Sequence, residues 1–188
     1  MRTAPESFEA RYREAPDPWG FAEDPYERAK YARTVAALGA RRFSRALELG
    51  CSNGELTVLL APFCARLIAL DASPTAAARA AARAATVAGV EVRQGLVPEE
   101  LPTGPWDLVV ASEILYYLDP ELLEVTVARL AADLVPGGLL LAVHWTGTAA
   151  SHALTADAVH TRLLAEAGLR AVVAERHEGY RLDLLTRT

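Results

Sequence analysis

Two polar segments follow apolar runs that have the length of buried strands. Gly50–Gly54 (GCSNG) lies between the apolar run 46–49 and a helical pattern. A loop of small residues before a helix lets the backbone approach a ligand closely. Asp71 closes the next apolar run about 20 residues later, the separation at which a carboxylate binds a ribose diol. The loop alone also suits a plain strand-to-helix turn, but together with Asp71 it indicates a nucleoside-containing ligand.

Two later apolar runs end in side chains that can move protons. Glu113 follows the run 106–111, and His144 ends the run 139–144. Carboxylates and imidazoles act as general bases when they lie within reach of the reacting group. Structural roles are the alternatives: a carboxylate favours a helix N-terminus, and a strand-end histidine often bonds to the backbone. His160 lies on a predicted helix, where packing or a surface position is at least as plausible.

Helical and strand-like patterns alternate along the chain, which is typical of a parallel sheet with crossover helices. We expect helices at 5–16, 25–39, 54–61, 74–88, 120–134 and 155–166, and strands at 46–49, 67–70, 90–93, 106–111, 139–144, 170–176 and 180–185. Glu178 and Gly179 form the only break between the last two strands, and so tight a connection joins antiparallel strands. The sequence predicts a seven-stranded, Rossmann-like α/β sheet that is mostly parallel, with ligands bound at the carboxyl ends of its strands.

The composition excludes several classes of protein. The 188 residues, 52% of them hydrophobic, suit one globular domain. A net charge of −5 argues against nucleic acid as the main partner. No apolar run approaches the roughly 20 residues that cross a bilayer, and we expect neither a membrane segment nor a signal peptide. Cys51 and Cys64 are too few for a disulfide framework, and no histidine pair has metal-ligand spacing. We therefore expect a cytoplasmic protein without a metal site; the oligomeric state stays open.

The loop also matches the nucleophile elbow of serine hydrolases, G-x-S-x-G, with Ser52 as the nucleophile. The acid and base would come from Asp107, Glu113, His144 and His160. Three observations count against this alternative. No glycine-rich oxyanion segment precedes the loop, few strands come before it, and Asp71 would have no role.

The glycine spacing of the loop distinguishes a dinucleotide from other nucleoside-containing ligands. A dinucleotide fingerprint needs a third glycine, and that position is Glu55. Leu47–Gly54 (LELGCSNG), followed by Asp71, instead resembles motif I and its acidic successor in class I S-adenosylmethionine-dependent methyltransferases. Pro136–Gly138 before the fifth strand, and the terminal hairpin, are similar as well. The resemblance covers about residues 44–187.

Three other stretches resemble the nodulation protein S-like group, which N-methylates the free amine of a deacetylated chitooligosaccharide. They are Phe8–Tyr31 (FEARYREAPDPWGFAEDPYERAKY), Ser112–Leu118 (SEILYYL), and Val143–Trp145 with Asp157–His160. The aromatic-rich N-terminal stretch is more specific than motif I, which all class I enzymes share.

The resemblance implies a cofactor role for several strand-end residues. Gly50, Ser52 and Gly54 would surround the methionine part of S-adenosylmethionine, and Glu48 would orient the loop or bind the methionine ammonium.

Asp71 would hold the ribose hydroxyls, and Ala72 would lie against adenine. Leu96 stands where such enzymes often have an acidic residue for the adenine amino group. Adenine would then rely on apolar contact and on the Leu96 backbone amide.

The resemblance also implies that residues 1–43 form a helical lid over a catalytic core at residues 44–188. Trp19 and either Lys30 or Arg28 would cover the cofactor from this lid, with the cation facing its carboxylate.

The expected function is methyl transfer from S-adenosylmethionine to a small molecule, with the amine of an amino sugar or glycoside as acceptor. Glu113 and His144 are the candidate bases because an amine must present a neutral lone pair, and Tyr117 is the candidate acceptor-orienting hydroxyl. The alternatives are an O-methyltransferase for another small molecule, the serine hydrolase, and a non-catalytic module that only binds the cofactor.

Overall fold

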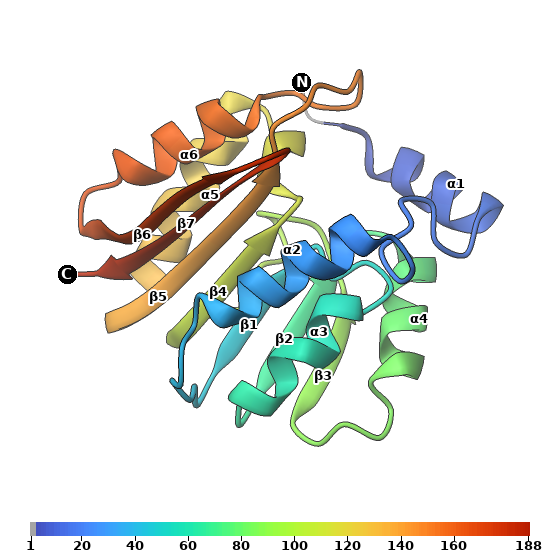
Figure 1. The fold of residues 1–188 in the computed structure, drawn as a ribbon, viewed down its shortest axis with the longest axis horizontal. Coiled ribbons are helices and arrows are strands. Elements are labelled where there is room, and N and C mark those ends of the chain that lie inside the picture. The colour runs from blue at the N-terminus through green and yellow to red at the C-terminus, as the bar shows by residue number, and fades with distance from the viewer. Residues whose placement is uncertain (1–2) are drawn as a thin grey trace.

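A computed structural model describes residues 3–188 as one mixed sheet with helices on both faces (Figure 1). The strands are β1 (Ala46–Leu49), β2 (Leu67–Asp71), β3 (Val90–Gln94), β4 (Trp106–Ser112), β5 (Leu134–Trp145), β6 (Leu169–His177) and β7 (Tyr180–Arg187). Their order across the sheet is β3-β2-β1-β4-β5-β7-β6, and β7 is antiparallel to both of its neighbours. The other pairs are parallel. The predicted fold class, with its antiparallel last strand, is confirmed.

Most of the helices begin at clear capping signals. The helices are α1 (Pro5–Glu14), α2 (Pro25–Ala36), α3 (Glu55–Leu60), α4 (Pro74–Arg83), α5 (Pro120–Asp133) and α6 (Ala156–Leu164), with the short 3-10 turns η1 (Ala61–Phe63) and η2 (Leu115–Tyr117). Side chains of Asp24, Ser73, Asp119 and Thr155 accept backbone N–H groups at the starts of α2, α4, α5 and α6. These caps satisfy donors that the first helical turn leaves free.

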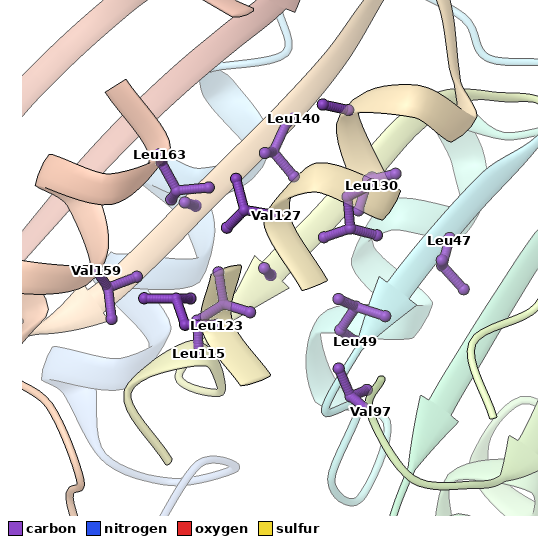
Figure 2. Close-up of a cluster of buried hydrophobic side chains, with 14 of the residues drawn as sticks. Leu47, Leu49, Val97, Leu115, Leu123, Val127, Leu130, Leu140, Val159 and Leu163 are labelled. Atoms are coloured by element: carbon purple, nitrogen blue, oxygen red, sulfur yellow. The ribbon is translucent and has the colours of Figure 1, made fainter. Parts of the chain in front are cut away.

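The central strands are apolar on both faces because helices cover both faces. On one face, Leu140 of β5 and Leu49 of β1 join a cluster with Leu130 of α5 and Leu163 of α6 (Figure 2). On the other face, Leu141 belongs to a second cluster with side chains of α2 and α3. Among the helices of residues 3–188, none combines the length and the apolar character that a membrane-spanning helix requires.

Two elements differ from the sequence-based expectation by five residues at one end. Helix α4 ends at Arg83 rather than near residue 88, because residues 84–89 turn back so that the Gly89 carbonyl accepts the Leu67 N–H at 2.8 Å. Strand β5 begins at Leu134 and includes the Pro-Gly-Gly segment that was expected to precede it. The pairing with β4 shifts register next to Trp106, so a bulge absorbs the turn-forming residues.

Helix α1 docks on the N-terminus of α4 through Glu9. The Glu9 carboxylate accepts hydrogen bonds from the Ser73 hydroxyl at 2.6 Å and from the Thr75 hydroxyl at 2.7 Å. These bonds, led by that of Ser73, lower the pKa of Glu9 to about 2. A carboxylate at a helix N-terminus is also favoured by the helix dipole. Glu9 therefore ties the N-terminal segment to the sheet domain.

This contact predicts an acid-sensitive α1. Because the pKa of Glu9 is lowered, its contribution is fully present above the unfolded value of 4.5 and is lost as the pH falls towards 2. Glu9→Gln should release α1 at neutral pH and accelerate tryptic cleavage after Arg11 and Arg13 several-fold. Glu6→Gln, on the exposed side of the same helix, is the matched control. Equal cleavage rates in both variants would contradict the docking role.

Candidate active site

One cavity of about 460 Å³ lies at the carboxyl edge of the parallel strands. Residues at the ends of β1, β2 and β4 line one side, and α1, α2 and the segment between them line the other. Its size falls in the range of roughly 300–1,000 Å³ that is typical of small-molecule sites. The cavity brings together most of the predicted site residues: Trp19, Lys30, Glu48, Gly50, Ser52, Asp71, Ala72, Leu96, Glu113 and Tyr117. Arg28, Gly54 and His144 are not among its lining residues.

The loop after β1 forms a cradle that requires glycine. Gly50 has φ +70°, and a Cβ there would lie 3.1 Å from the side chain of Ile114. Gly54 has φ +82° and caps α3; a Cβ there would lie 3.0 Å from the Ala80 Cα. Gly54 therefore serves helix packing below the cavity, while Gly50 leaves space at its surface. Ser52 has φ +51°, an uncommon value for a residue with a side chain.

Asp71 organises the second part of the cradle. One carboxylate oxygen accepts the Ser52 N–H at 2.8 Å, and the other accepts the Ser73 N–H at 2.9 Å. Burial raises the pKa of Asp71 to about 6 despite these bonds. The next wall residues are Ala72 and Leu96, but the Leu96 N–H already donates to Glu100 Oε2 at 2.8 Å. The expectation that this amide binds adenine is therefore corrected. Of the two interactions expected for adenine, only apolar contact with the Leu96 side chain is left.

Glu48 is a carboxylate buried at the floor of the cavity. It is only 1% exposed, and the Thr57 hydroxyl donates to its Oε2 at 2.6 Å. Burial raises the pKa of Glu48 to about 8, because this single hydrogen bond does not offset the loss of hydration. Such a group favours a cation as its ligand.

The ammonium of Lys30 joins α2 to the end of β4. It is 1% exposed and donates to Glu27 at 2.9 Å and to Glu113 Oε1 at 2.6 Å. Lys30 is thus already paired with two carboxylates, and Arg28 is exposed outside the cavity. Neither cation is positioned as expected for a ligand carboxylate. Arg11 lines the cavity instead, 5.8 Å from the Trp19 ring centre.

Glu113 sits at a strained backbone position, with φ +55°. Besides Lys30, its carboxylate accepts the Trp145 N–H at 2.9 Å and a short hydrogen bond from the Tyr116 hydroxyl. Tyr117 packs edge-on against Phe8 of α1, with ring centres 4.7 Å apart. Both predicted residues, Glu113 and Tyr117, face the cavity from the segment that follows β4.

His144 differs from its predicted placement. The ring is completely buried, and its Nε2 accepts the Leu115 N–H at 3.1 Å. Its Nδ1 lies 3.1 Å from His160 Nε2. Burial lowers the pKa of His144 well below its usual value. The side chain points into the packed layer beneath η2, so the expectation that it faces an acceptor is corrected.

An aromatic wall from the N-terminal segment was not predicted residue by residue. Tyr12 donates to the Ser52 Oγ at 2.6 Å, which fastens α1 to the glycine loop. Trp19 lies between Tyr12 and Phe21, with ring centres 5.2 Å and 5.8 Å away. The cavity lining includes further aromatic rings that sequence reasoning missed: Phe8, Tyr26, Tyr31, Tyr116, Trp145 and His152. The aromatic-rich composition of residues 8–31 was the available signal for Phe8, Tyr26 and Tyr31, and it says nothing of the three rings from later in the sequence.

The serine hydrolase alternative finds no support in this geometry. The partner of the Ser52 hydroxyl is Tyr12, and within residues 3–188 no histidine is hydrogen-bonded to it. Asp107 accepts the N–H groups of Ser44 and Arg45 near the amino ends of β1 and β4. It therefore lies at the sheet edge opposite the loop. Residues 3–188 contain no group of three or more His, Cys, Asp and Glu side chains that could hold a metal ion.

The strand order, the glycine cradle and the acidic end of β2 are those of the class I S-adenosylmethionine-dependent methyltransferases. A family model for Nodulation protein S (NodS) matches residues 6–176. The chain belongs to the NodS family, which confirms the resemblance seen in the sequence.

Individual relatives agree with this assignment. Nodulation protein S of Rhizobium tropici is 35% identical over 129 residues, which are 68% of this chain and 54% of the relative. The crystal structure of the N-methyltransferase NodS from Bradyrhizobium japonicum WM9, in complex with S-adenosyl-l-homocysteine, has a TM-score of 0.85 and 26% identity, and the match covers 97% of this chain and 98% of that chain. A putative methyltransferase from Pseudomonas syringae is 38% identical with a TM-score of 0.76, covering 86% of this chain and 99% of that one. The chain spans 54–61% of the length of the first three curated relatives it matches.

The environment of Glu48 makes a pH-dependent prediction. Because the folded pKa is raised to about 8 from 4.5, the folded state holds its proton more tightly than the unfolded state. This contribution stabilises the fold at low pH and is lost as the pH rises from about 5 to about 8. Glu48→Gln should flatten the decline in melting temperature over that interval. Carboxyl NMR titration should place the Glu48 midpoint near 8, and Thr57→Val should raise it further by removing the hydroxyl donor. A midpoint at the ordinary value would contradict this assignment.

Proposed function

We propose that this chain is an S-adenosylmethionine-dependent methyltransferase that methylates the amine of a small molecule, with an amino sugar or glycoside as acceptor. The observation that carries the proposal is a single cavity with two chemically different parts. Its cofactor side contains Glu48, Asp71 and the glycine cradle, whereas its acceptor side contains Glu113 and Tyr117. Membership of the NodS family, and the activity named for the Bradyrhizobium japonicum relative, support the choice of nitrogen.

The residues of the cofactor side fit the parts of S-adenosylmethionine. When bound, it supplies a methyl group on an electrophilic sulfonium. Gly50 leaves the space that a Cβ would fill, and the buried Glu48 carboxylate suits the ammonium of the methionine part. Asp71 would accept hydrogen bonds from the ribose hydroxyls, and Arg11, which also lines the cavity, would face the carboxylate of the methionine part.

The acceptor side both orients an amine and offers it a carboxylate that is already partly hydrogen-bonded. A carboxylate has about four acceptor positions. Lys30, Tyr116 and Trp145 occupy three positions on Glu113, which leaves about one for an N–H of the acceptor. Glu113 would hold the amine with its lone pair towards the methyl group and take up the released proton, because alignment itself supplies much of the acceleration.

The rings of Phe8 and Tyr117 form an apolar wall next to that position. This wall suits a sugar ring, whose faces carry C–H groups. The Tyr117 hydroxyl would orient the acceptor, and burial raises its pKa to about 12, so it acts as a neutral hydroxyl.

Asp71→Ala tests the cofactor site. Loss of a charged acceptor for two hydroxyls should cost about 1.5–3 kcal/mol of binding free energy. Calorimetry should therefore show roughly 10- to 150-fold weaker binding of S-adenosylhomocysteine, with no binding of NAD to either protein. Asp157→Ala, on the exposed face of α6, is the control. Unchanged affinity in a folded Asp71→Ala protein would refute the ribose role.

Glu113→Gln tests the acceptor site. Turnover on an amino-sugar acceptor should fall by about 10²-fold or more, with cofactor affinity near normal, because proton acceptance is worth roughly 10²–10⁴ in rate. Glu27→Gln removes the other carboxylate on Lys30 and is the matched control. An equal loss in both variants would assign the effect to the Lys30 ion pair. Acceptors that carry a hydroxyl in place of the amine should be assayed as well. Methylation of these acceptors alone would show that the enzyme is an O-methyltransferase.

A further inference from the structure

A chain of buried hydrogen bonds runs beneath the acceptor side of the cavity. Asp183 of β7 lies 2.8 Å from His160 Nδ1 on α6, and His160 Nε2 lies 3.1 Å from His144 Nδ1 on β5. His144 Nε2 in turn accepts the N–H of Leu115, the first residue of η2, at 3.1 Å. The three polar side chains are 0% exposed. Polar groups buried so completely are costly unless every partner is satisfied.

The two ends fix the direction of every bond in the chain. A backbone N–H only donates, so His144 Nε2 must be unprotonated and its proton must lie on Nδ1. That proton points to His160 Nε2, and His160 therefore also carries its proton on Nδ1 and donates it to Asp183. Both rings are thus assigned the Nδ1–H tautomer, because the partner at one nitrogen decides the state of the other.

The acidic end is held ionised. Burial acts to raise the pKa of Asp183, but the hydrogen bond from His160 and the hydrogen bond and charge of Arg181 outweigh it and lower the pKa. Arg181 Nη2 lies 2.9 Å from the same carboxylate oxygen that accepts from His160. An ionised Asp183 can only accept, in agreement with the direction derived above.

The other end of the chain holds the segment that carries the acceptor side. Leu115 lies two residues after Glu113, whose positive φ is unfavourable for a residue with a side chain. The His144 ring also packs edge-on against Tyr116, with ring centres 5.1 Å apart. A strained segment persists only when its surroundings hold it, and the bond from Leu115 is one of those restraints.

We propose that Asp183, His160 and His144 are positioning residues that hold η2, and with it Glu113 and Tyr117, in the geometry required by the methyl acceptor. They act through the backbone of Leu115 rather than on the acceptor, because none of them lines the cavity. Glu48 and Asp71 lie on β1 and β2, away from this chain, so cofactor binding is independent of it. The effect on turnover rests on the proposed function, whereas the bonding pattern does not.

The first measurement needs no variant and no acceptor. Long-range ¹H–¹⁵N NMR spectra of the 188-residue protein report which ring nitrogen carries the proton. Both His144 and His160 should appear as neutral Nδ1–H tautomers. Protonation on Nε2 in either ring would overturn the proposal, whether or not an acceptor is ever found.

The second measurement compares three variants. His144→Leu removes the acceptor of the Leu115 N–H and should lower turnover on the amine by roughly 10- to 100-fold, the cost of a misplaced reacting group. Its affinity for S-adenosylhomocysteine should stay within about a factor of two, because distant sites are usually independent. His144→Gln offers an amide oxygen to the Leu115 N–H and should restore most of the turnover. His177→Leu, which lies outside this series of hydrogen bonds, is the control.

Each outcome decides between the alternatives. Equal turnover of His144→Gln and His144→Leu, or a parallel loss of cofactor affinity, would reduce His144 to a general packing residue and overturn the proposal. If His144→Leu does not fold, the NMR assignment decides. If the wild-type protein methylates no amine, the proposed function fails. The tautomers of His144 and His160 still test the proposed hydrogen-bond pattern.

Discussion

The buried ammonium of Lys30 is the interaction on which the rest of the site depends. A charge removed from water is tolerated only when it is paired, and Lys30 meets this demand through Glu27 on its own helix and Glu113 after β4. The pair fixes α2 against the carboxyl edge of the sheet. It also holds Glu113 at its unfavourable backbone conformation. Closure of the cavity and placement of its acceptor side therefore follow from the same ion pair.

The N-terminal helices complete a cavity that the sheet alone would leave open. Glu9 attaches α1 to α4, Tyr12 attaches it to the glycine loop, and the Thr3 N–H donates to the Tyr117 carbonyl at 3.0 Å. These three contacts reach both the cofactor side and the acceptor side. The segment thus acts as a shared wall, and its aromatic rings line the cavity.

The two sides of the cavity differ in their electrostatics. Glu48 and Asp71 have raised pKa values because burial is not balanced by a cation, which prepares them for a ligand with a positive charge or with hydroxyl donors. Glu113 is already paired with Lys30. The hydrogen-bond acceptor position that is left on its carboxylate suits orientation of a methyl acceptor. His144 contributes from below, through the backbone, and its burial shows that a histidine at a strand end need not face the ligand.

The sequence by itself determined the sheet and the cradle, because apolar periodicity, the Gly50–Gly54 loop and Asp71 are local signals with few structural solutions. The family followed from a resemblance, carried above all by the aromatic-rich stretch Phe8–Tyr31. Only the tertiary structure decided which side chains meet. Lys30 reaches a carboxylate that follows β4, and the Leu96 amide is taken by a carboxylate in its own loop. His144 and Glu113 both come at the carboxyl end of a strand. The Glu113 side chain faces the cavity, whereas the His144 side chain is buried in the core. Side-chain direction and burial depend on packing between distant elements, which no local pattern encodes.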